Sequence, residues 1–178
     1  MPDATGLELI RQELGDAALD TSFLHERAVL EVRAERVRDV LAALRLKGYA
    51  FLASLHGVDY YPHEPRLGVL YELLDMARVD RISVKVRVSS ERPLLDSIVP
   101  DGEGPDGEGD GHVGWPAANF QEREVYDMFG VVFRDHPDLR RILMPEDYEG
   151  NPQRRDFPVG GEPIVFTYNE SPVLEGSE

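Results

Sequence analysis

Prolines divide the end of this 178-residue chain into short pieces. They stand after Gly130 at positions 137, 145, 152, 158, 163 and 172. Proline lacks a backbone N–H and clashes with the preceding helical turn, so this region cannot form a long helix. The Phe, Leu, Ile and Tyr residues between the prolines predict an extended arm that needs a surface to lie on, and not a second core.

The first hundred residues carry regular apolar patterns. Apolar residues spaced three and four apart predict one helix over Leu7 to Leu14, which Gly15 ends as a left-handed cap, and a second over Val37 to Leu44, with Gly48 just beyond it. Strand patterns cover residues 28–32, 51–61, 67–74 and 81–88. In the last of these, four aliphatic residues alternate with polar ones, as expected for a strand with one buried and one exposed face.

These patterns predict an α+β fold. We expect a small mixed, mainly antiparallel sheet with helices on one face, followed by one helix and an extended proline-rich C-terminal arm. The expected parts are an α+β domain over residues 1–98, an acidic Gly-rich loop over 99–114, and the helix and subunit-docking arm over 115–178.

Charge and composition exclude several classes of function. The formal net charge of −15 argues against nucleic-acid binding and against anionic membrane surfaces. The chain has no cysteine, which excludes disulfides, thiolate zinc sites, iron–sulfur ligation and thiol nucleophiles. No apolar run reaches the ~20 residues that span a bilayer, and no signal peptide is visible, so we expect a cytoplasmic location.

Metal binding has little support in the sequence. Residues 106–111 imitate the start of a calcium loop, but its closing position falls on Ala117 instead of a carboxylate, which favours a solvated linker. The five histidines (25, 56, 63, 112 and 136) form no i, i+4 pair, and His136 is interpreted as a structural hydrogen-bonding residue.

A helix is predicted from about Pro116 to Phe129. Phe120, Glu124 and Met128 are four apart, which places Glu124 within the apolar stripe. A carboxylate there is either a catalytic acid in a cleft or half of a buried ion pair, with an arginine from 140, 141, 154 or 155 as its partner. The ion pair is favoured because the sequence offers no second convergent catalytic group. Arg123 and Asp127, also four apart, are predicted to pair along the helix surface.

Three consecutive motifs point to a known family: EREVYDMFG at 122–130, HPDLRRILMPEDYEG at 136–150 and NPQRRDFP at 151–158. They resemble the C subunit of NADH-quinone oxidoreductase, the bacterial counterpart of the 30-kilodalton subunit of respiratory complex I. Residues 115–120 and the strand end at 57–60 fit the same family. The acidic loop at 101–112 does not, and is interpreted as an insertion.

The resemblance implies a non-catalytic, cofactor-free subunit in the peripheral arm of a proton-translocating NADH:quinone oxidoreductase. FMN and iron–sulfur clusters are then expected in partner subunits. No residue of this chain is expected to be catalytic or to bind a cofactor or a metal. The chain would dock chiefly on the D and B subunits, on the cytoplasmic side of the bacterial cell membrane, and would associate with the membrane only through the complex.

The motifs also imply a docking face. Its residues are Glu122, Arg123, Glu124, Tyr126, Asp127, Phe129, Gly130, His136, Pro137, Arg140, Arg141, Asp156, Phe157 and Pro158. Apolar anchors for the partner are expected at Phe133, Leu139, Ile142, Leu143, Tyr148 and Phe157. An arm that orders only on binding would leave the free chain mobile from Gly130 to Pro158, which hydrogen exchange tests.

Three alternatives remain open from the sequence. The first is the equivalent subunit of a membrane-bound hydrogenase or of a ferredoxin- or F420-dependent complex. The electron donor of such an assembly differs from that of an NADH:quinone oxidoreductase. An acidic calcium-binding or protein-binding module would respond to calcium in calorimetry. A small enzyme using Glu124 would show turnover by the purified chain alone.

Overall fold

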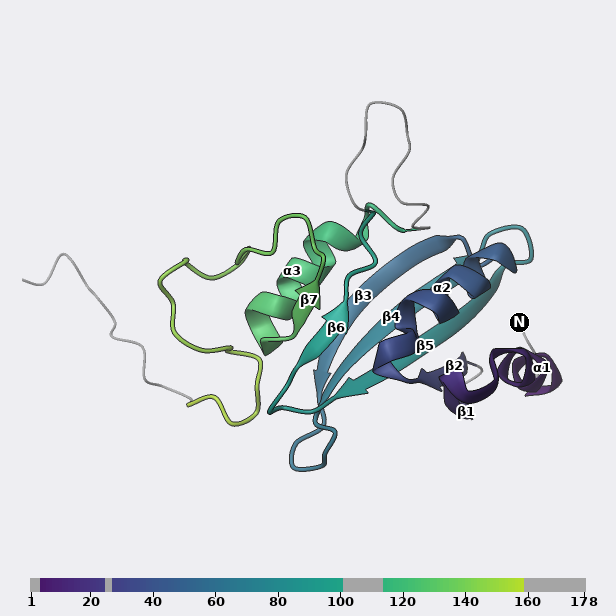
Figure 1. Ribbon diagram of the computed structural model, residues 1–178, viewed down its shortest axis with the longest axis horizontal. Helices are drawn as coiled ribbons and strands as arrows, with labels where there is room; N and C mark the ends of the chain where they lie inside the picture. Colours follow the sequence, from purple (N-terminus) through teal and green to yellow (C-terminus); the bar gives the residue numbers. More distant parts are fainter. Residues whose placement is uncertain (1–3, 25–26, 101–113, 159–178) are drawn as a thin grey trace, which may run out of the picture.

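The computed structural model describes residues 4–24, 27–100 and 114–158, and its centre is a five-stranded mixed sheet (Figure 1). The strand order is β1-β2-β5-β4-β3, and only the β2–β5 pair is parallel. The strands are β1 (Ala18–Leu24), β2 (Arg27–Val32), β3 (Phe51–Asp59), β4 (Leu67–Asp75) and β5 (Asp80–Val88). The predicted antiparallel meander is confirmed in β3, β4 and β5.

Three α-helices and a second small sheet complete the described fold. The helices are α1 (Ala4–Leu14), α2 (Val37–Leu46) and α3 (Ala118–Phe129), and short 3-10 turns occur at η1 (Gly15–Ala17) and η2 (Ala34–Arg36). Strands β6 (Leu94–Asp96) and β7 (Val132–Arg134) form a parallel pair. Gly15 has φ +57° where α1 ends, which confirms the predicted left-handed residue.

The alternation in β5 decides which face of the sheet is covered. Val84 lies in register with Tyr71 and Leu30, and all three are fully buried. The next residue, Lys85, belongs to the opposite face, where it forms an ion pair with Glu31 at 2.8 Å. The helices therefore pack on the Val84 face, as predicted. The buried residues of α2 join the same core at Val37, Val40, Leu41 and Leu44.

Helix α3 and the start of the arm belong to that core too. Trp115 is buried and its indole N–H donates to the Ala50 carbonyl oxygen at 2.9 Å, while Val125 of α3 packs in the core cluster. Phe133 in β7 is 2% exposed. The interpretation of Phe133 as a partner anchor is therefore wrong, because pairing of β7 with β6 turns its ring into the core of this chain.

Sequence patterns missed three of the strands. β6 and β7 have three residues each, too few to show a period of two. β1 contains a register shift between Ala18 and Asp20, which interrupts its alternation. Helix α3 starts at Ala118, two residues after the predicted Pro116. No helix among the described residues has the length and apolarity to cross a membrane.

Candidate functional site

The predicted docking residues gather around α3 and the segment from Gly130 to Pro158, here called the C-terminal arm. Apart from β7, the arm has no regular secondary structure. Beyond β7 it runs beside α3 (Figure 1). Its shape must therefore come from side-chain contacts and not from a backbone ladder.

The buried glutamate of α3 is Glu122 and not Glu124. Glu122 is 0% exposed, whereas Glu124 is exposed and Phe120 is 64% exposed. The expected stripe through Phe120, Glu124 and Met128 is wrong because α3 turns Ala118, Glu122 and Val125 toward the core. The Arg123 guanidinium lies over the Phe120 ring at 5.8 Å and shields part of that exposed ring.

Glu122 connects α3 to the segment after β6. Its carboxylate accepts hydrogen bonds from the Ser97 hydroxyl at 2.6 Å and from the Ile98 backbone N–H at 2.8 Å. Burial raises the pKa of Glu122 to about 7, although these two hydrogen bonds oppose that change. The His136 ring lies 3.9 Å from the same carboxylate.

His136 holds the beginning of the arm, as its structural interpretation predicted. Nε2 lies 3.2 Å from the Asn119 carbonyl oxygen, and Nδ1 accepts from the Asp138 backbone N–H at 3.0 Å. These partners fit the neutral Nε2–H tautomer. Burial is the main cause of a lowered His136 pKa, which favours the same neutral form.

Asp127 holds the middle of the arm. Its fully buried carboxylate accepts from the backbone N–H groups of residues 142, 143 and 144 at 3.0, 2.8 and 2.9 Å, and from Arg141 Nη1 at 2.6 Å. Burial raises the pKa of Asp127, but these hydrogen bonds outweigh it, and the pKa lies below its usual value. The predicted Arg123–Asp127 surface pair is wrong, because Arg123 donates instead to the carbonyl oxygens of Arg140 and Arg141.

The arm also satisfies the C-terminal end of α3, where helical carbonyl groups lack partners. Asn151 Nδ2 donates to the Asp127 carbonyl at 3.0 Å, the Gln153 N–H to that of Met128 at 3.1 Å, and Arg154 Nε to that of Phe129 at 2.6 Å. Gly130 ends the helix with φ +75°. A Cβ at Gly130 would lie 2.5 Å from the Asn151 side-chain oxygen, so the close approach requires glycine.

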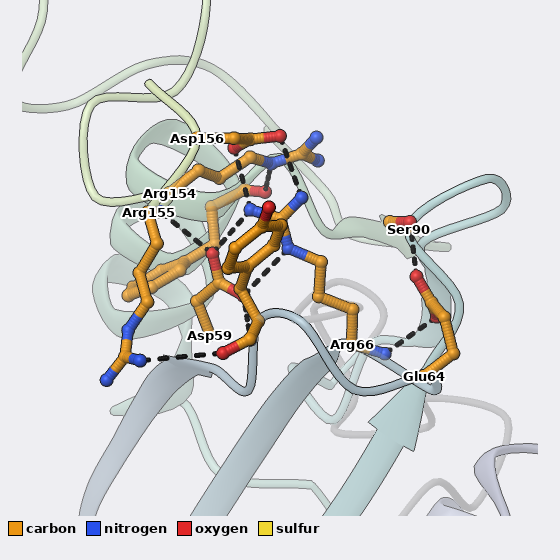
Figure 2. A network of polar contacts seen from close by, with 9 residues as sticks. Asp59, Glu64, Arg66, Ser90, Arg154, Arg155 and Asp156 are labelled. Carbon is orange, nitrogen blue, oxygen red and sulfur yellow. Dashed lines mark hydrogen bonds and ion pairs between the residues drawn. The ribbon is translucent and has the colours of Figure 1, made fainter. Parts of the chain in front are cut away.

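The end of the arm is fastened to the sheet by Arg66, the residue just before β4. Arg66 donates to both carboxylate oxygens of Asp59 at 2.8 and 2.6 Å, and to both of Asp156 at 2.7 Å (Figure 2). The Arg155 backbone N–H adds a bond to Asp59 at 2.8 Å. The Arg66 hydrogen bonds hold the pKa of Asp59 and of Asp156 below the usual range.

The predicted docking residues therefore divide into two groups. Those whose side chains or backbone are engaged within the chain are Glu122, Arg123, Tyr126, Asp127, Phe129, Gly130, His136, Arg141, Asp156 and Phe157. The exposed ones are Glu124, Pro137, Arg140 and Pro158, of which Arg140 pairs locally with Asp138. The favoured hypothesis of a buried ion pair at Glu124 is wrong, because Glu124 is exposed; the acid of α3 that pairs with an arginine of the arm is Asp127, whose partner is Arg141.

Sequence reasoning missed the roles of Asp59, Arg66, Ser97 and Asn151. Most of their partners lie far along the chain, and no periodic pattern connects them. One signal was present: Asp59 and Arg66 flank the proline-bearing turn between two predicted strands, where opposite charges meet when the strands pair antiparallel.

Three carboxylates of this region are bound within the chain. The carboxylates of Glu122, Asp127 and Asp59 each accept several hydrogen bonds from the chain itself. Within residues 4–24, 27–100 and 114–158, no group of three or more His, Asp or Glu side chains gathers to hold a metal ion. Residues 106–111, which imitate the start of a calcium loop and are predicted to be a solvated linker, lie outside the described residues.

Comparison with known proteins decides the family. The family described as the 30 Kd subunit of respiratory-chain NADH dehydrogenase matches residues 30–104 and 112–163. The chain belongs to this family. The 30 Kd subunit match covers strands β3, β4 and β5 of the sheet and the whole arm, and its gap falls inside the acidic loop interpreted above as an insertion.

Relatives within the 30 Kd subunit family cover most of the chain. The C subunit of NADH-quinone oxidoreductase from Roseiflexus castenholzii is 42% identical over 177 residues, 97% of this chain and 94% of the relative. NADH-quinone oxidoreductase subunit 5 of Thermus thermophilus is 40% identical over 141 residues, 74% of this chain and 62% of the relative. The resemblance drawn from residues 122–158 is confirmed.

Solved structures share the fold. The trypsin-resistant fragment of Nqo5 superposes with a TM-score of 0.62 and 31% identity, over 78% of this chain and 100% of that chain. A chain of the membrane-bound sulfane sulfur reductase, an archaeal respiratory membrane complex, superposes with a TM-score of 0.66 over 86% of both chains. Because the second chain is 24% identical, this comparison supports a shared fold and nothing more.

Proposed function

We propose that this chain is a structural subunit of the peripheral arm of a proton-translocating NADH:quinone oxidoreductase, with no cofactor of its own. In this role it supports electron transfer from NADH to quinone by docking on the D and B subunits, at the cytoplasmic face of the bacterial membrane. The observation that carries the proposal is the C-terminal arm, whose buried polar groups are bound within the chain. The arm thus offers a preformed outer surface.

Preorganisation is the physical advantage of this design. A segment that orders on binding loses part of the interaction free energy to its own ordering. Here the Asp127 and Arg66 contacts already fix the arm at its middle and its end. The free energy of contact with a partner is then available for association and not for folding the arm.

The outer surface of α3 and the arm has the chemistry of a protein interface. Phe120 on α3 is 64% exposed and Leu143 on the arm is 60% exposed, large apolar side chains of the kind that act as interface anchors. Exposed charges stand near them in the sequence at Glu124 and Arg140. We infer that these exposed residues contact the partner, while Glu122, Asp127 and Asp156 support the arm from inside.

The absence of cysteine from the sequence supports placing iron–sulfur clusters in partner subunits, because such clusters are held by thiolates. FMN is placed there by the same proposal. The activity then belongs to the assembled complex, and the isolated chain contributes fit and stability to it.

Co-purification from membranes of the source bacterium tests this function. The tagged full chain is expected to co-elute with flavin- and cluster-bearing subunits, and the eluate to oxidise NADH with quinone as acceptor. Recovery of the chain alone would overturn the proposal. A co-eluting complex without an NADH-oxidising flavin subunit would instead assign the chain to a related respiratory membrane complex.

Surface variants test the docking face itself. Phe120→Asp combined with Leu143→Asp is expected to abolish co-elution while leaving the thermal unfolding midpoint of the free chain unchanged, because both side chains are exposed. Met76→Asp is the matched control. Met76 is 69% exposed in the β4–β5 turn, at the far end of the sheet from the arm, and its variant is expected to co-elute normally (Figure 1). Equal behaviour of the two variants would contradict the assigned face.

A further inference from the structure

A cavity of about 340 Å³ lies where the two parallel strands of the main sheet both end. The chain leaves β2 through Ala34 and Glu35 and leaves β5 through Ser89, and all three residues line the cavity. Neighbouring parallel strands end at the same edge of a sheet, so the segments that leave β2 and β5 lie close together and border this cavity. The volume is within the range of small-ligand pockets.

The charge of this cavity is opposite to that of the chain. Arg87, Arg92 and Arg134 line it, against one carboxylate, Glu35. The whole chain carries a formal charge of −15, so a site with three guanidinium groups and one acid stands out. Arg134 is paired with Asp96. Arg92 is exposed, and its side chain has no ion pair with any residue that the structure describes.

Arg87 carries an unused donor. Its guanidinium stacks over the Tyr60 ring at 4.6 Å, which fixes the position of the group. The Nε atom is buried and has no hydrogen-bond partner within the described part of the chain. Because Nε is buried, a ligand in the cavity would meet the other nitrogens of this guanidinium, which the Tyr60 ring holds in place.

We propose that this cavity is a binding site for the phosphate group of a small phosphate ester. Guanidinium groups bind phosphate oxygens in pairs through parallel N–H bonds. A phosphate monoester offers three terminal oxygens and accepts from Arg87 and Arg92 together, whereas a carboxylate offers two. The Ser89 hydroxyl supplies a further donor, and Val88 and Leu94 give an apolar wall for the organic part of the ester.

Titration calorimetry of the full chain at constant ionic strength tests the site with glycerol 1-phosphate. Saturable binding is expected, and Arg92→Gln is expected to weaken it about tenfold or more, since a charge-assisted pair of hydrogen bonds is lost. Arg81→Gln is the matched control, because it removes the same charge from the opposite end of β5 and is expected to bind like the wild type. Arg92 is exposed, so its variant is expected to keep the wild-type unfolding midpoint.

A second experiment identifies the source of the phosphate. Phosphatidylcholine vesicles that contain phosphatidic acid are tested by flotation, and a response there alone, lost in Arg92→Gln, assigns the site to a lipid headgroup. Citrate is tested in parallel. The proposal is overturned if neither the ester nor the vesicles bind, or if Arg92→Gln leaves binding intact. It is also overturned if citrate binds more tightly than the ester. Normal co-elution of Arg92→Gln with partner subunits keeps this result separate from the proposed subunit role.

Discussion

The carboxylate of Asp156 lies 2.7 Å from two nitrogens of the Arg66 guanidinium, ninety positions earlier in the chain. The same guanidinium binds Asp59, so one cation serves an acid of the sheet and an acid of the arm (Figure 2). The three side chains differ in exposure: 8% for Arg66, 3% for Asp59 and 49% for Asp156. This difference predicts unequal consequences for their removal.

Arg66→Gln is expected to lower the free energy of unfolding by about 2–4 kcal/mol, because it leaves the buried Asp59 carboxylate without its cation. Asp156→Asn is expected to cost less than about 1 kcal/mol, since that half of the network is half-exposed and screened by water. Urea unfolding of both variants measures the two losses. Equal losses would show that burial does not control the energetics of this network.

Asp127→Asn is expected to release the middle of the arm. The neutral amide offers one acceptor oxygen in place of two and turns an N–H₂ group toward donors. Loss of hydrogen bonds to a buried charge costs about 1.5–3 kcal/mol. Hydrogen exchange of the Ile142, Leu143 and Met144 amides is expected to accelerate before global unfolding.

Glu124→Gln is the matched control for Asp127→Asn, as an exposed acid on the same helix. It is expected to leave both stability and exchange unchanged. Wild-type amides at 142–144 that exchange at the rate of an unstructured peptide would instead support an arm that orders only on binding.

Glu122 predicts a stability that depends on pH. Its pKa rises from 4.5 when unfolded to about 7 when folded, so the folded state holds a proton that the unfolded state releases between these values. The contribution is fully present below pH about 4.5 and is lost as the pH rises through about 7. His136, whose pKa is lowered by burial, adds a slope of opposite sign.

Glu122→Gln removes only the glutamate titration. The stability of the variant minus that of the wild type is therefore expected to rise with pH across this window, by up to about 3 kcal/mol. Urea unfolding near pH 4.5 and near pH 7.5 measures the change. A difference between variant and wild type that is the same at both pH values would contradict the assigned titration.

Gly57 in β3 allows a steric test of how closely α3 packs on the sheet. A Cβ there would lie 2.4 Å from the Phe129 ring, so Gly57→Ala is expected to destabilise the fold by about 1–3 kcal/mol through overpacking. Phe129→Leu in the same chain is expected to recover part of that loss, because the smaller side chain leaves room for the methyl group. Additive losses in a double-mutant cycle would show that the two residues do not meet.

Local patterns were sufficient for most of the main sheet. The alternation in β5 predicted its buried face, and the spacing of Val37, Val40 and Leu44 predicted α2. Such patterns work because a helix or strand with one apolar face has few ways to bury it. The same reasoning failed for α3, where Phe120 suggested the wrong face and placed Glu124 inside instead of Glu122.

The sequence by itself determined that the region after Gly130 forms no long helix, since proline acts locally through its missing N–H and its fixed φ. Through its motifs it also determined the family. Only the tertiary structure decided that Asp127, His136 and Asp156 hold the arm from inside the chain. Their partners Met144, Asn119 and Arg66 come close only after folding, and no local period records a contact that three-dimensional packing creates.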